Sequence, residues 1–194
     1  MLLGLLTACS STRITSSWRE PNKDVIINNL NKVLVVAIFK NETTRHEAEN
    51  QMASYLKGKG VVSYDYLNET FNKQNKEALR DKIRQDGFDG AITMRLIDVD
   101  KKADYAHGSF DNYPSYYRSF SGYYYGNIGY YNNPGYYTFT KTYTVETNVY
   151  SIKEDKIIWT GLTKSVNPDG VDKMVSEISK VVYKRMIKEG FIKK

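Results

Sequence analysis

Residues 33–39 read VLVVAIF, an unbroken apolar run rich in β-branched side chains. Such a run is typical of a strand that is covered on both faces, because an exposed face would require alternating polar residues. We therefore expect these residues to form the central strand of a sheet with helices packed against it.

A helix is expected directly after this strand. Thr44 and Glu47 have the spacing of a capping box, in which the two side chains satisfy each other's backbone donors. Gly58 and Gly60 should end the helix. Its expected apolar face comprises Ala48, Met52, Tyr55 and Leu56.

The alternation of strands and helices then continues. A second strand is expected over 61–66, and Asn75 can cap a second helix that turns Leu79 and Ile83 inward. Apolar and polar residues alternate over 91–99, which predicts a third strand. This order indicates a sheet with parallel strands joined by helices.

An antiparallel hairpin and a last helix complete the pattern. Residues 139–149 alternate as a strand with one wet face, 153–156 form a charged turn, and 157–166 form the returning strand. Asp169 can cap a final helix. The apolar stripe expected on that helix is Val171, Met174, Val175, Ile178, Val182 and Met186.

The predicted fold class is therefore α/β (α+β). We expect a single mixed sheet of about five strands, with the helices packed on it and the order β-α-β-α-β-insertion-β-β-α. The domain should span 32–194, with the tyrosine-rich insertion at 105–137. A chain of 194 residues agrees with one domain plus a tail.

The charge balance is basic, at +6, but lysine is spread along the chain without a dense block. No helix-turn-helix, zinc-finger or RNA-binding pattern accompanies the charge. We therefore expect no nucleic-acid partner.

The N-terminal residues contain the only cysteine, Cys9, after a short apolar run. That run is too short to span a bilayer, which takes about 20 residues. Leu6-Thr7-Ala8-Cys9 resembles the lipobox of bacterial lipoproteins, in which a peptidase cuts before the cysteine and the cysteine is then acylated. A structural cysteine near the terminus is the alternative. No lysine or arginine precedes the run, so the true start codon can lie upstream of Met1.

This resemblance implies a localisation. Residues 1–8 would be a signal-peptide remnant and 9–31 a lipidated tether that docks through Trp18. Ser10 follows the cysteine instead of the aspartate that retains lipoproteins in the inner membrane. The expected place is the periplasmic face of the outer membrane, with the acylated Cys9 as the membrane contact.

The insertion is unusual because eleven of the 17 tyrosines lie in 105–137. A connection of this length is usually functional or disordered. The rings can cover a sheet face, stack on a glycan or a protein partner, or insert into a bilayer as a hairpin. The candidate binding surface consists of Tyr116, Tyr117, Tyr123, Tyr124, Tyr125, Tyr130, Tyr131, Tyr136 and Tyr137.

The order of elements, and the turn from Val35 to Thr43, resemble a group of envelope α/β domains. The group includes the curli-secretion lipoprotein family (CsgG), the outer-membrane activators of penicillin-binding proteins, and the N-terminal domain of the Tol-system propeller protein. Residues 147–161 resemble bacterial lipoproteins of unknown function in which a strand, a charged turn and a Trp-x-Gly strand recur. These families share a sheet and no common reaction, so no catalytic residue carries over.

Chemistry-bearing residues are sparse. His46 and His107 are far apart and have no cysteine partner, so we expect no metal site. Asp98 and Asp100 would share one face of a strand, which a weak hydrolase hypothesis requires, although a solvated strand end is the simpler interpretation. We expect no enzyme and no cofactor.

The sequence therefore predicts a non-catalytic envelope lipoprotein that binds or scaffolds other components. Its partner would be an envelope protein, with peptidoglycan or another polysaccharide bound by the tyrosine-rich hairpin as the alternative. A homo-oligomer is left open.

Overall fold

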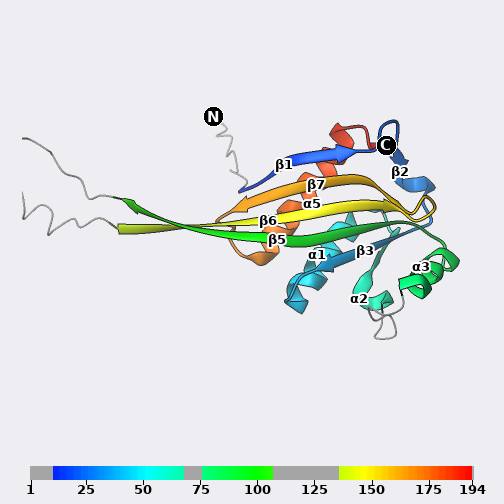
Figure 1. Cartoon of the computed structure of the whole chain (residues 1–194), viewed down its shortest axis with the longest axis horizontal. Coiled ribbons are helices and arrows are strands. Elements are labelled where there is room, and N and C mark those ends of the chain that lie inside the picture. The colour runs from blue at the N-terminus through cyan, green and yellow to red at the C-terminus, as the bar shows by residue number, and fades with distance from the viewer. Residues whose placement is uncertain (1–10, 68–75, 107–135, 194) are drawn as a thin grey trace, which may run out of the picture. The chain divides into compact units, whose positions relative to one another are not determined.

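The computed structural model describes residues 11–67, 76–106 and 136–193. Figure 1 shows its strands and helices. The strands are β1 (Thr12–Arg19), β2 (Val25–Ile26), β3 (Lys32–Ile38), β4 (Gly60–Val62), β5 (Phe88–Ala106), β6 (Tyr136–Ser151), β7 (Lys156–Val166) and β8 (Ile192–Lys193). The helices are α1 (Glu42–Ser54), α2 (Ser63–Tyr66), α3 (Lys76–Gln85) and α5 (Val171–Lys188), with a short 3₁₀ helix η1 (Ile27–Asn29).

Six strands form one mixed sheet in the order β1-β7-β6-β5-β3-β4. β3 runs parallel to β4 and β5, whereas β7 runs antiparallel to β1 and β6. β2 and β8 form a separate parallel pair. The predicted mixed α/β class is confirmed, with six strands in the main sheet instead of about five, because the sequence pattern does not reveal β1.

The side chains of β3 alternate between two cores. Val33, Val35 and Ala37 belong to the larger core, in which α1 and α5 cover one face of the sheet. Leu34 belongs to a smaller core on the other face, with Ile83 of α3. This two-sided burial explains the unbroken apolar run. The expected central position is wrong, because β3 is fifth in the sheet and β6 and β5 are central.

The start of α1 also differs from the expected capping box. Asn41 is the N-cap, and its Oδ1 accepts a hydrogen bond from the Thr44 amide at 2.9 Å. Asn41 lies three residues before Thr44, so its side chain caps an unpaired amide of the first turn and the helix starts earlier than expected. Glu47 therefore has no capping role, and it accepts a hydrogen bond from the Gln51 side chain. The predicted apolar face is confirmed at Ala48, Met52 and Leu56, which are buried. Tyr55 is half-buried and stacks on Tyr183 of α5.

α3 and α5 bear the expected apolar residues. Ile83 is buried, and the expected cap Asn75 lies outside the described residues, as does 68–75. On α5 the predicted stripe is buried at Met174, Val175, Ile178, Val182 and Met186. Val171 is exposed because it is the first helical residue, and Gly170 precedes it as the N-cap. The expected Asp169 cap is wrong, because its carboxylate pairs with Lys173.

Residues 12–19 form β1, although the sequence predicts a tether there. Thr12 lies opposite Ser165 of β7, and their hydroxyl oxygens are 2.7 Å apart. Trp18, which was expected to dock a tether, is a residue of β1 and is 44% exposed. The tether interpretation is therefore wrong for this segment, because it pairs with β7 as a strand of the sheet.

The chain divides into two compact units. One comprises Met1–Val99 and Thr142–Lys194, and the other comprises Asp100–Lys141. In the first unit β5 and β6 are neighbours that run in opposite directions, as Figure 1 shows. In the second unit the Thr138 hydroxyl donates to the Asp104 carbonyl at 3.1 Å. The loop expected between these strands lies outside the described residues.

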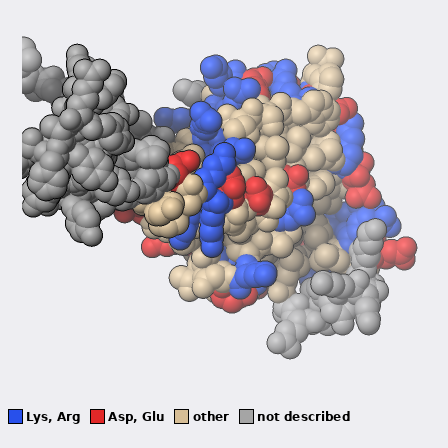
Figure 2. Space-filling view, turned by 60° about the vertical axis from the view of Figure 1, so that its left-hand side comes forward, with Lys and Arg blue, Asp and Glu red and all other residues tan. Residues whose placement is uncertain are grey.

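The charges are distributed as the sequence predicts. Lysine and arginine side chains are scattered over the face that Figure 2 shows, with aspartate and glutamate among them. Many pair with a neighbour, for example Lys82 with Asp86 at 2.8 Å. Exposed pairs of this kind contribute little to stability.

Candidate functional site

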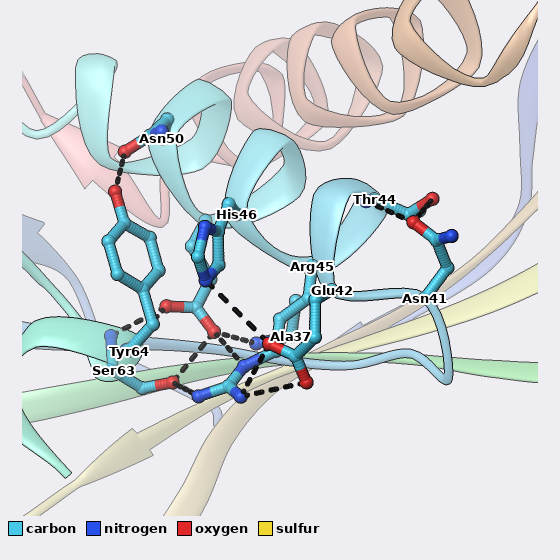
Figure 3. Close-up of polar contacts among 10 residues, drawn as sticks. Ala37, Asn41, Glu42, Thr44, Arg45, His46, Asn50, Ser63 and Tyr64 are labelled. Carbon is cyan, nitrogen blue, oxygen red and sulfur yellow. Dashed lines mark hydrogen bonds and ion pairs between the residues drawn. The ribbon is translucent and has the colours of Figure 1, made fainter. Parts of the chain in front are cut away.

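A fully buried carboxylate lies where α1 meets the ends of β3 and β4 (Figure 3). The side chain of Glu49 is 0% exposed. Its Oε1 accepts hydrogen bonds from the Ala37 amide at 3.0 Å and the Ser63 hydroxyl at 2.7 Å. Its Oε2 accepts from the Ser63 amide at 2.6 Å and the Tyr64 amide at 3.3 Å. Arg45 Nε, 3.3 Å from Oε1, adds a positive charge.

Glu49 takes the place of a missing strand partner. β4 pairs with β3 only as far as Val35 and Val62, because the chain turns into α2 at Ser63. Ala37 lies beyond that pairing, so β4 offers its amide no acceptor, and the Glu49 carboxylate accepts instead. The second strand expected over 61–66 therefore ends at Val62, and a helical turn follows.

Several partly exposed side chains lie around Glu49. The His46 ring stacks on the Tyr64 ring with 3.9 Å between the centroids. His46 Nε2 lies 3.7 Å from the Glu42 carboxylate, and the Tyr64 hydroxyl donates to Asn50 at 2.8 Å. His46 thus lies in α1 as expected, and its neighbours join α2 to α1.

The arrangement around Glu49 suits structure better than proton transfer. A general base needs an oxygen that faces the group it deprotonates. Both oxygens of Glu49 are occupied by donors from the chain itself, and the side chain is sealed from solvent. A buried carboxylate with several donors is costly to disturb. We interpret Glu49 as a clamp between α1 and the sheet.

A groove of about 540 Å³ opens at the carboxyl end of β3 and beside the middle of β5, and we call it the end groove. Exposed apolar side chains form much of it: Ile38 is 56%, Leu96 38% and Val171 45% exposed. Its lining comprises Ile38, Phe39, Lys40, Asn41, Thr44, Arg95, Leu96, Tyr143, Val171 and Met174. In open sheets, ligands bind outside the carboxyl ends of parallel strands. The end groove is therefore the candidate binding surface.

A second hollow, of about 250 Å³, lies at the opposite end of β3. Buried apolar side chains of the larger core, such as Ile27, Ile92 and Phe191, line it together with charged and polar residues such as Lys23 and Asp89.

A second acidic residue fastens β1 to the C-terminal part of the chain. Glu189 accepts hydrogen bonds from the Ser17 hydroxyl at 2.5 Å, Trp159 Nε1 at 2.8 Å and Arg185 Nε at 2.6 Å. Burial raises the pKa of Glu189, but the hydrogen bonds from these three donors outweigh it and hold the pKa below the usual range of glutamate. The network links β1, β7 and the end of α5.

Most residues of the predicted sites lie outside the described residues. Cys9, the remnant 1–8 and His107 do, as do Tyr116, Tyr117, Tyr123, Tyr124, Tyr125, Tyr130 and Tyr131. Tyr136 and Tyr137 begin β6, and Tyr137 is 64% exposed. Phe139 is 70% exposed and shares a strand face with Tyr137. The tyrosine surface and the lipidation site stay predictions.

Asp98 and Asp100 both lie on β5 with exposed side chains. Exposure agrees with the simpler interpretation, a solvated strand end. Neither residue provides the buried or enclosed carboxylate that would support the hydrolase hypothesis.

Sequence reasoning missed Glu49 and the end groove. A signal for Glu49 was present, because it stands three residues before Met52 and seven before Leu56, on the apolar side of α1. A charged residue at a core position indicates a buried polar contact. The groove had no local signal, because its lining comes from β3, β5, β6 and the starts of α1 and α5.

No helix of the described residues combines the length and apolarity needed to cross a membrane. No family model and no curated protein matches this chain. It is similar in structure to the PelC dodecamer from Paraburkholderia phytofirmans, at 8% identity and a TM-score of 0.47, over 89% of this chain and 95% of that chain. It is also similar to lipoprotein GNA1162 from Neisseria meningitidis, at 11% identity and a TM-score of 0.41, over 81% of this chain and 98% of that chain.

A bacterial lipoprotein is thus among the structures that this chain resembles. At these TM-scores and identities the likeness carries no conclusion about this chain. These comparisons do not show the curli-secretion, activator or Tol group, so that more specific resemblance stays a prediction.

Proposed function

We propose that this chain is a lipid-anchored, non-catalytic binding module of the bacterial cell envelope. Its anchor is Cys9, and its place is the periplasmic face of the outer membrane, because Ser10 follows the cysteine. Its working surface is the end groove.

The composition of the end groove carries this proposal. Its described lining holds exposed apolar side chains and two cations, Lys40 and Arg95, and it holds no carboxylate, imidazole or thiol. The described lining therefore lacks histidine and the carboxylates, which are frequent general acids and bases, and Lys40 and Tyr143 are its remaining side chains of a type that can transfer a proton. An apolar surface with a few polar contacts suits the binding of a partner.

The anchor is tested by acyl labelling of the full chain in a bacterial host that processes lipoproteins. We expect labelled palmitate in the wild-type protein and none in Cys9→Ala, because the thiol is the attachment point. Ser10→Ala is the matched control and should keep the label. Label that persists in Cys9→Ala, or a wild-type protein without label, would overturn the anchor.

Glycan binding is the second candidate, and the exposed rings of Tyr137 and Phe139 favour it. Neighbouring rings on one strand face can stack on sugars. We expect the full chain to pellet with purified peptidoglycan sacculi, and a chain that lacks 106–135 and carries Tyr137→Ala and Phe139→Ala to stay in solution. If the wild-type chain does not pellet, the glycan candidate is wrong.

A further inference from the structure

The sheet begins almost at the predicted anchor. Ser11 already contacts the domain: its carbonyl accepts from the Val166 amide at 3.0 Å, and its hydroxyl donates to Glu177 at 3.2 Å. Cys9 stands two residues earlier. Two residues span at most about 7 Å even when fully extended. Whatever is attached to Cys9 must therefore lie close to this end of the sheet.

The same end of the sheet contains the end groove. Thr12 lies opposite Ser165 of β7, and Ser165 lies opposite Tyr143 of β6. Tyr143 lines the groove. Neighbouring strands are about 4.8 Å apart, so the start of β1 lies roughly 10 Å from the Tyr143 backbone. Val171, at the start of α5, lines the same groove.

The exposed side chains at this end of the sheet are of two kinds. The first is apolar, namely the exposed side chains of Ile38, Leu96 and Val171. The second is cationic. Arg13 and Lys164 lie directly opposite each other across β1 and β7, and both are exposed. Like charges in that position repel each other unless an anion joins them.

Most of the carboxylates near these cations form ion pairs with other residues. Arg13, Lys164 and Lys40 form no ion pair within the described residues. Glu42 pairs with Arg45, and Asp169 pairs with Lys173. Exposed Asp172 in the first turn of α5 is a carboxylate of opposite sign. Figure 2, which turns this end forward, shows uncharged surface among scattered lysine, arginine and acidic side chains.

We propose that the end groove faces a phospholipid bilayer. Ile38, Leu96 and Val171 would enter the boundary between head groups and acyl chains, while Arg13, Lys164 and Lys40 contact lipid phosphates. This inference rests on the proposed acylation of Cys9, and it names the partner of the proposed surface.

Two observations favour a bilayer over a protein partner. Exposed apolar side chains at the same end of the sheet as lysine and arginine match an interfacial membrane surface, where long cations reach the phosphates. The short link between Cys9 and Ser11 also sets the geometry, because the backbone of Cys9, which would bear the acyl chains, lies within about 7 Å of Ser11. A long tether over 9–31 would have left the domain free to turn, but β1 removes it.

The test uses the full acylated chain in vesicles of phosphatidylcholine and phosphatidylglycerol. Cys9 is the only cysteine, so once it is acylated an introduced cysteine is the one free thiol. A polarity-sensitive fluorophore is attached to Ile38→Cys or, separately, to Val171→Cys. The matched control is Ile26→Cys, an exposed isoleucine of β2, because β2 pairs with β8 beyond the far end of α5. Circular dichroism verifies that each variant is folded, and intact mass verifies acylation.

We expect nitroxide-labelled lipids to quench the probes at Ile38 and Val171 several-fold more than the probe at Ile26. Quenching should weaken in vesicles of phosphatidylcholine alone, because the zwitterionic lipid keeps its phosphate but lacks the net negative surface charge that attracts the cations. Equal quenching at the three positions in an acylated protein would overturn this inference and leave the anchor in place. A probe at Ile38 that is shielded from water without lipid quenching would also overturn it, in favour of a protein or a second copy. A protein without acyl groups would overturn both proposals.

Discussion

Replacement of Glu49 by alanine should destabilise the domain strongly. The change removes the acceptor of two buried backbone amides, those of Ala37 and Ser63. A buried donor that loses its partner costs about 1–3 kcal/mol, so the two amides together predict a loss of about 2–6 kcal/mol. The total stability of a domain of this size is about 5–15 kcal/mol. Glu49→Ala should therefore remove a large part of it.

Urea unfolding followed by circular dichroism measures this loss through the midpoint and the slope. Glu47→Ala is the matched control, because Glu47 lies on the same helix and accepts only from the Gln51 side chain. That variant should change the free energy of unfolding by about 0.5 kcal/mol or less. Glu49→Gln should fall between the two, because it keeps the shape and one acceptor oxygen. A Glu49→Ala protein within about 1 kcal/mol of wild type would refute the clamp.

Two further predictions follow from the packing and the polar contacts. Gly60→Ala should cost about 1–3 kcal/mol, because its new Cβ would lie 2.8 Å from the Ala53 Cβ and 2.9 Å from the Ala53 Cα. Gly58→Ala meets open space and should cost less, about 1 kcal/mol for its positive φ; equal urea midpoints for the two variants would contradict this. Glu189 should make stability fall in acid: its lowered pKa means that its contribution is complete above the unfolded pKa of about 4.3 and is lost as the pH drops through the folded value. Urea midpoints from pH 6 to pH 3 should therefore fall less steeply in Glu189→Gln than in wild type, and parallel profiles would contradict the assignment.

Local patterns were sufficient for the elements that bury an apolar face. β3 is visible in the sequence as an unbroken apolar run, and β7 and α5 are visible because their apolar residues recur at the spacing of a strand and of a helix. β1 has no such pattern. It pairs through polar residues such as Thr12, which is buried against Ser165. A polar strand of this kind resembles a tether until its distant partner is known.

The candidate site depends on contacts that no local pattern contains. Glu49 is held by donors from α1, from β3 and from the start of α2, and only the fold brings these together. The end groove likewise joins residues from five elements. Ile38 and Leu96 have the sequence pattern of core positions, because both are apolar residues of apolar strand segments. Their side chains are exposed because the strands extend past the helices that would cover them.

The pairing of β1 with β7 has a consequence for the time course of folding. Thr12 and Ser165 touch although 153 positions separate them in the chain. β1 is synthesised long before β7, and it can join the sheet only after β7 has formed. Closing so long a loop is slow, and until then the free side of β7 is an open edge on which another strand can pair. β1 therefore cannot be incorporated into the sheet as it emerges and has to wait for the synthesis of β7.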